Sequence, residues 1–120
     1  KIYFDPTMSA ESLSPLSFYI LLALHDGPAH GWGIIKRIRE ITEGQSDPST
    51  GSLYLAMMRL ENAGLIAEGK RPAGDSDDAR RRYYKLTPAG RTAAQAEAHR
   101  LAQLVDHARQ RRVIPDTRNA

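Results

Sequence analysis

The sequence predicts an α+β fold that is mainly α, with a two-stranded β-hairpin placed before its last helix. Two observations predict this order. A helical segment with an apolar stripe ends near Ala63 and passes directly into the apolar stretch Leu65-Ile66-Ala67. A second extended segment over residues 80–86 is followed at once by another helix start. A helix followed by a hairpin with a basic return strand is the core of a winged helix-turn-helix domain, which is the fold class that we predict.

The first helix is predicted to begin at Ser14-Pro15, because serine caps a helix N-terminus and proline suits the first helical turn. Asp26-Gly27-Pro28 ends it. This helix is apolar on nearly all sides, so it must be covered on more than one side. Its own core supplies one cover, and we expect a second subunit to supply the other, with Leu21 in that interface.

The second helix is expected from near His30 to about Thr42, where four isoleucines recur at helical spacing and Gly44 follows as the stop. Lys36 falls on its solvent-exposed side. These features predict the first helix of a helix-turn-helix pair.

The third helix is expected to start at Asp47-Pro48 or at Ser49 and to continue to Ala63, with four apolar side chains at inward positions. The hairpin follows directly. Residues 69–79 form its loop, because glycine, proline and aspartate are concentrated there.

The last helix begins with Thr87 as cap and can run to about Arg112. About 25 residues span roughly 40 Å, which is too long for a helix that lies wholly on a small core. Its apolar residues recur at steps of four and three, as in a coiled coil, and are Ala94, Ala98, Leu101, Val105 and Ala108, with Leu104 beside them. We therefore expect this helix to form a dimer; the alternative is a terminal helix that folds back on its own domain.

The chain accordingly divides into four segments. We expect an N-terminal arm over residues 1–13, a winged-helix domain over 14–87, a dimerisation helix over 88–112 and a flexible tail over 113–120. A chain of 120 residues has room for one compact domain and one element outside it.

Composition and motifs argue against an enzyme. The chain has no cysteine, and its four histidines lack partners at metal-ligand spacing. There is no nucleophile motif and no phosphate-binding glycine loop, so we expect no catalytic residue, no metal and no cofactor. The longest apolar run, residues 18–24, is far shorter than the roughly 20 residues that cross a bilayer, and no export leader opens the chain. We therefore expect a cytoplasmic protein without membrane contact.

The net charge is +3, and the positive excess is concentrated after the third helix. Residues 65–91 carry seven basic and four acidic side chains. A basic region beside a helix-turn-helix is the electrostatic signature of a nucleic-acid partner, so we expect the protein to bind double-stranded DNA.

The third helix supplies the first candidates for DNA contact. Thr50 and Ser52 place hydroxyl groups and free backbone N–H groups in the first turn, where the helix dipole favours a phosphate. Tyr54 either contacts the DNA or packs under the hairpin, and the sequence leaves both interpretations open. Arg59 lies further along the helix, where it either reaches the DNA backbone or is simply solvated, and we do not expect it to read bases.

The return strand supplies the strongest basic signal. Because side chains alternate along a strand, Tyr84 should point to the core and the opposite face should point outward. The outward face carries Arg81, Tyr83 and Lys85, which we expect to contact phosphates together with Lys36. The alternative is a merely solvated edge, and the acidic residues at the hairpin tip would repel phosphates.

Three motifs in order resemble the PadR family of bacterial transcriptional regulators. They are His30-Gly31-Trp32-Gly33-Ile34-Ile35, Gly51-Ser52-Leu53-Tyr54 with residues 59–66, and Arg82-Tyr83-Tyr84-Lys85-Leu86-Thr87-Pro88-Ala89-Gly90. The resemblance implies a homodimeric winged-helix repressor whose long C-terminal helix mediates dimerisation. It also implies an inverted-repeat operator, and effectors that are small aromatic or hydrophobic compounds.

Two positions depart from the family pattern. Leu55 stands where the family commonly has proline after the motif tyrosine. Drug-binding relatives have a tryptophan on the C-terminal helix, which here has no aromatic residue. The aromatic candidates for an effector site are therefore Phe18, Tyr19 and Trp32, with Tyr3-Phe4 near the N-terminus.

Together these patterns predict a sequence-specific DNA-binding regulator, a repressor that acts as a homodimer on an inverted-repeat operator and is released by a small aromatic or hydrophobic effector. The alternative is a winged-helix module used only for protein–protein assembly, without specific DNA binding.

Overall fold

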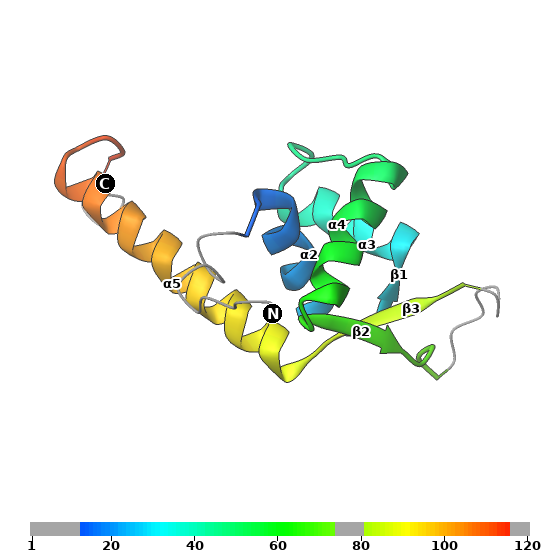
Figure 1. Ribbon diagram of the computed structural model, residues 1–120. Coiled ribbons are helices and arrows are strands. Elements are labelled where there is room, and N and C mark those ends of the chain that lie inside the picture. The colour runs from blue at the N-terminus through cyan, green and yellow to red at the C-terminus, as the bar shows by residue number, and fades with distance from the viewer. Residues whose placement is uncertain (1–12, 74–80, 116–120) are drawn as a thin grey trace.

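The computed structural model describes residues 13–73 and 81–115. The fold is mainly helical with a small antiparallel sheet (Figure 1). In chain order its elements are α2 (Pro15–His25), β1 (Ala29–His30), α3 (Gly31–Ile41), α4 (Thr50–Asn62), β2 (Ile66–Gly69), β3 (Tyr83–Leu86) and α5 (Pro88–Gln110). The predicted fold class is therefore confirmed. The tip of the hairpin, most of the N-terminal arm and residues 116–120 lie outside the described residues.

Side-chain caps start the helices where the sequence predicts them. The hydroxyl of Ser14 accepts the Ser17 N–H at 3.1 Å, and the hydroxyl of Ser49 accepts the Ser52 N–H at the same distance. Thr87 caps α5 in the same way. Because each cap satisfies an otherwise unpaired N–H, these residues fix the first turns of α2, α4 and α5.

The sheet has the order β1-β3-β2, so β3 is its central strand. On one side Ile66 lies opposite Leu86, and on the other side His30 lies opposite Tyr83. The two-residue strand β1 was not predicted. It precedes α3 directly, and the ring of His30 also caps that helix, because its Nδ1 accepts the Gly33 N–H at 3.1 Å.

The core lies between α2, α3, α4, the sheet and the first turns of α5. Its fully buried large side chains come from every layer except α5, and they are Ile20, Leu21, Ile34, Ile38, Leu53, Met57 and Ile66. The whole of Leu21 is thus enclosed by its own protomer. Our expectation that Leu21 lies in a subunit interface is wrong, because the apolar character of α2 on nearly all sides is used within the protomer.

The first part of α5 is tied to the body, and the rest extends away from it (Figure 1). The Thr87 hydroxyl donates to the Gly64 carbonyl oxygen at 2.6 Å, and Gly90 packs against the Leu65 carbonyl so closely that a methyl group there would overlap it. Ala94 and Glu97 are also buried, but from Ala98 to the end of α5 no residue is buried. Ala94 therefore belongs to the protomer core, which corrects its expected place in a subunit interface.

Candidate nucleic-acid interface

The two faces of α4 differ sharply. One face packs into the core through Leu53, Ala56, Met57 and Leu60. The opposite face is exposed and consists of Gly51, Tyr54, Leu55, Met58 and Asn62, which recur at helical spacing. We call these five residues the outward face of α4. Because the core does not use this face, it is available to a partner.

The first turn of α4 provides unpaired donors. The first hydrogen bond between backbone groups of this helix runs from the Leu53 N–H to the Ser49 carbonyl at 2.9 Å, so the N–H groups of Thr50 and Gly51 precede it. Thr50 and Ser52 are both exposed. The Ser52 hydroxyl accepts a hydrogen bond from Ser49 at 3.0 Å, within the cap. This turn is thus suited to an anion such as a phosphate.

Tyr54 is partly packed and partly exposed. Its hydroxyl group lies against the backbone of Gly31, where a methyl group would overlap it, yet 46% of the residue is exposed. The tyrosine therefore packs against the start of α3 and remains partly exposed. The exposed part of Tyr54 belongs to the outward face of α4.

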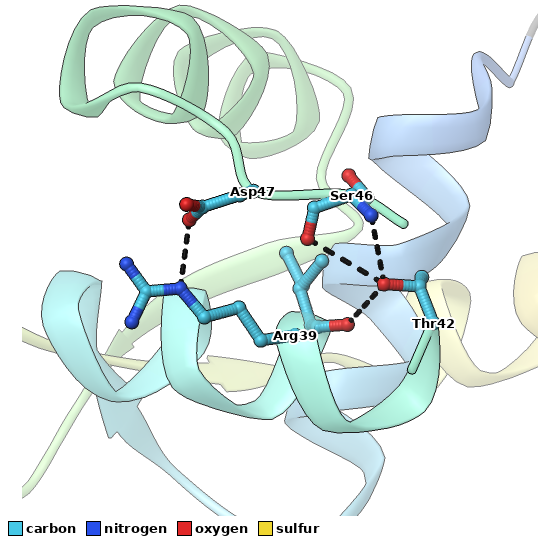
Figure 2. Close-up of polar contacts among 5 residues, drawn as sticks. Arg39, Thr42, Ser46 and Asp47 are labelled. Atoms are coloured by element: carbon cyan, nitrogen blue, oxygen red, sulfur yellow. Dashed lines mark hydrogen bonds and ion pairs between the residues drawn. The ribbon is translucent and has the colours of Figure 1, made fainter. Parts of the chain in front are cut away.

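Polar contacts hold the turn between α3 and α4 (Figure 2). The Thr42 hydroxyl accepts the Ser46 N–H at 3.0 Å and donates to the Ile38 carbonyl at 2.8 Å. The Nε of Arg39 donates to Asp47 at 2.7 Å. These contacts orient α4 relative to α3, which fixes where the outward face points.

The side chain of Trp32 takes part in the same region. The guanidinium carbon of Arg39 lies 5.0 Å from the centre of the Trp32 ring, in a cation–π arrangement. Lys36, one turn along α3, is exposed and makes no hydrogen bond or ion pair with a described residue. Within the described residues, no acidic side chain neutralises the charge of Lys36.

Of the two β3 residues that we expected to point outward, one is exposed and the other is buried. Lys85 is exposed as predicted, whereas Tyr83 is only 3% exposed, so the expected outward orientation of Tyr83 is wrong. Its ring meets the ring of His30 edge to face at 5.2 Å. β1 pairs with β3 at this position, so β3 is a central strand and the ring of His30 packs against Tyr83.

Arginines around β3 are engaged within the protomer. Arg81 lies 3.0 Å from His30, between Nη1 and Nε2, and Arg82 pairs with Glu68 at 3.2 Å. Arg82 also lies over the ring of Tyr84, 5.5 Å from its centre. Burial raises the pKa of Tyr84, and the positive charge of Arg82 opposes that rise. The pKa of Arg82 is raised first by Tyr84 and then by the hydrogen bond to Glu68.

Arg59 lies on the flank of the outward face of α4, where it lines an open-sided cavity of about 540 Å³. The cavity lies between α2, the end of α4 and α5, and its lining includes Leu13, Ser17, Arg59, Leu65, Thr92 and Ala96. None of the effector candidates Phe18, Tyr19 and Trp32 lines it. Phe18 and Tyr19 lie on α2, and Trp32 lies on α3 against Arg39.

The described residues contain neither a candidate metal site nor a helix that could span a membrane. No group of three or more histidine, cysteine or acidic side chains among them is placed to hold a metal ion. None of the helices in this part of the chain is long and apolar enough to cross a membrane.

Comparison with known proteins adds independent evidence. The model of the transcriptional regulator PadR-like family matches residues 20–96. Over 85 residues, this chain is 41% identical to a curated relative, an uncharacterized 37.1 kDa protein in transposon TN4556 of Streptomyces fradiae. The match covers 71% of this chain but only 22% of that protein, so the chain spans about a fifth of the length of the curated relative it matches.

Solved structures agree with the fold. A PadR family transcription regulator from Clostridium difficile has 26% identity and a TM-score of 0.67, and the match covers 81% of this chain and 97% of that one. A PadR-like transcription factor from Bacteroides fragilis has 28% identity and a TM-score of 0.59, with coverage of 86% and 98%. Both are transcription regulators rather than enzymes. Since the family model matches well over half of the residues, this chain belongs to the PadR-like family of transcriptional regulators.

Proposed function

We propose that the protein is a sequence-specific repressor that binds an inverted-repeat operator as a homodimer. The single observation that carries this proposal is the exposed outward face of α4, opposite a face that is packed into the core. A helix presented in this way, after a short turn and before a hairpin, fits the DNA major groove. Such a protein acts in the cytoplasm, where it meets the chromosome.

Positioning contacts come from elements on either side of α4. The free N–H groups of its first turn and the hydroxyl of Thr50 bind one phosphate, and Lys36 of α3 binds another. Lys85 of β3 binds the DNA backbone beside the hairpin. Arg81 contributes from the same edge, where it keeps its contact with His30.

Dimerisation is assigned to the part of α5 beyond the core. Leu104 is 53% exposed and Val105 is 39% exposed, and they continue the seam of Ala98, Leu101 and Ala108. Exposed apolar residues at coiled-coil spacing on a projecting helix are typical of an interface between helices. A homodimer would thereby place two copies of α4 on one operator.

A small aromatic or hydrophobic effector releases the DNA by binding in the cavity at the base of α5. A volume of about 540 Å³ suits a small molecule, and a ligand there touches both the DNA-binding body and the dimerisation helix. Release requires that the ligand bind more tightly to a dimer whose two α4 helices are spaced incorrectly for the operator.

Affinity selection of fragments from the host genome tests the DNA-binding proposal. The affinity for the selected fragments should be about a thousand times that for random DNA of equal length, or higher, at the same salt concentration. Their affinity should also fall log-linearly with salt concentration. Equal, weak binding to every fragment would contradict the proposal and favour the protein-assembly alternative.

The effector proposal has a separate test with a matched pair of variants. Compounds that weaken operator binding should lose their effect on Ala96→Phe, because the ring fills the cavity from an exposed lining position. Gln95→Phe adds the same ring outside the lining and should leave the response unchanged. Equal responses in both variants would place the effector elsewhere.

A further inference from the structure

The centre of the outward face of α4 is apolar. Leu55 is 46% exposed and Met58 is 51% exposed, and they lie three residues apart on the same side of the helix. The two charged residues of α4, Arg59 and Glu61, lie on the flanks of this face by helical periodicity. The part of α4 that would enter the major groove most deeply therefore offers few hydrogen-bonding groups.

The surroundings of this face favour DNA over a protein as its partner. Tyr54 joins it to the start of α3, and the hairpin follows from the end of α4. These neighbouring elements carry Lys36, Lys70 and Lys85, which are exposed and make no ion pair with a described residue. An apolar strip, with cations on the neighbouring elements that have no ion-pair partner among the described residues, complements a polyanion whose groove has an apolar feature.

The major groove offers one such feature on its base edges. Thymine presents its C5-methyl group there, whereas the other groove edges of the base pairs present hydrogen-bond donors and acceptors. An apolar side chain against a donor or acceptor would remove water from it without replacing the hydrogen bond, which is unfavourable. Contact with a methyl group carries no such penalty.

Spacing also fits this partner. Two residues three positions apart on a helix are separated by about 4.5 Å along its axis. Successive base pairs are about 3.4 Å apart, so the two side chains can meet neighbouring or nearby pairs. The unbranched Met58 side chain can adjust to the exact position of a methyl group.

We infer that Leu55 and Met58 read thymine methyl groups, so that each operator half-site carries thymines opposite the middle of α4. This inference rests on the proposed DNA-binding function. It assigns sequence discrimination at these positions to apolar contact, while the charged and hydroxyl-bearing residues position the protein on the phosphates.

Replacement of thymine by deoxyuridine tests the inference directly, because it removes only the methyl group and keeps base pairing. Each thymine of a genome-selected half-site is replaced in turn, and affinity is measured by fluorescence anisotropy. One or more positions should lose about fourfold in affinity, as expected when the contact with one methyl group is lost. Replacing cytosine by 5-methylcytosine elsewhere in the site serves as a control for groove chemistry.

Variants connect the effect to the two residues. Leu55→Ala with Met58→Ala should bind the thymine and deoxyuridine sites equally, because the partner of the methyl group is gone. Both positions are exposed, so the fold should be retained. Glu61→Ala is the matched control on the same helix and should keep the deoxyuridine penalty.

The outcomes separate the two proposals. Specific binding without any deoxyuridine penalty would overturn the thymine inference and leave the regulator proposal intact. Failure to select any preferred fragment would overturn the regulator proposal itself. A penalty that persists unchanged in the Leu55→Ala, Met58→Ala variant would assign methyl recognition to other residues and also overturn the inference.

Discussion

The cations among the described residues differ in whether they have a polar partner within the protomer. Arg37 donates to backbone carbonyl groups of Ala23 and Gly27 at 2.9 and 2.7 Å, and Arg39, Arg82 and Arg100 form ion pairs with acidic side chains. Lys36 and Lys85 are exposed without such a partner in the described part of the chain. A count of basic residues along the sequence therefore overstates the charge that is available to a phosphate.

Lys36→Met with Lys85→Met should weaken binding to all DNA sequences about equally, because methionine keeps the apolar stem and removes the charge. The slope of log affinity against log salt should become shallower by about 0.9 for each phosphate that the variant no longer neutralises. Anisotropy titrations at several salt concentrations measure it. Arg91→Ala also removes an exposed positive charge but lies at the start of α5, and an equal effect from this variant would contradict the assignment.

Residue types predict some of this site and not the rest. The exposure of Lys36 and Lys85 followed from helical and strand periodicity, and both are confirmed as exposed. The same rule predicted an exposed Tyr83, which is buried. The rule fails there because it assumes that one face of the sheet is open to solvent. The contact between its ring and His30 joins residues 53 positions apart, which no local pattern reveals.

At the scale of the elements, capping residues predict where helices begin. Ser14, Ser49 and Thr87 each start a helix as predicted, because capping depends on hydrogen bonds within four residues. The two-residue strand β1 escaped prediction, since a strand of that length has no periodicity and exists only through its pairing with β3. Local signals thus specify helices well and short sheet contacts poorly.

Two glycine substitutions should have opposite effects on stability. In Gly90→Ala the new methyl group would overlap the Leu65 carbonyl oxygen and crowd Leu86, which should lower the free energy of unfolding by about 3 kcal/mol. In Gly51→Ala the methyl group meets nothing within 4 Å, and the better helix propensity should raise that free energy by up to about 1 kcal/mol.

Urea denaturation followed by circular dichroism measures both changes. Equal stability of the two variants would show that the junction between β2 and α5 is looser than the close packing of Gly90 implies. Gly51→Ala should in addition weaken operator binding, because Gly51 belongs to the face that approaches the DNA.

At the scale of the whole molecule, α5 divides between two roles. Its first turns complete the protomer core, and its second half carries Leu101, Leu104 and Val105 away from that core. The sequence predicted one continuous seam from Ala94 onward. Periodicity alone could not tell which seam residues face the protomer and which face a partner, because both surfaces require the same apolar spacing.

Leu104→Glu with Val105→Glu should convert a dimer into a monomer, with the dimer dissociation constant raised about a hundredfold or more by the loss of buried apolar surface and by charge repulsion. Sedimentation velocity over a range of concentrations measures the change. Gln103→Glu adds a charge at an exposed position of α5 outside the seam and is the control. A dimer that survives the double substitution would rule out this seam as its interface.

The central claim is that two copies of the outward face of α4 read one operator at a fixed separation. Insertion of five base pairs between the half-sites of a genome-selected operator tests it, because half a helical turn places the two half-sites on opposite sides of the DNA. We expect the affinity to fall about a hundredfold or more, toward that of a single half-site. An unchanged affinity for the lengthened operator would contradict the account.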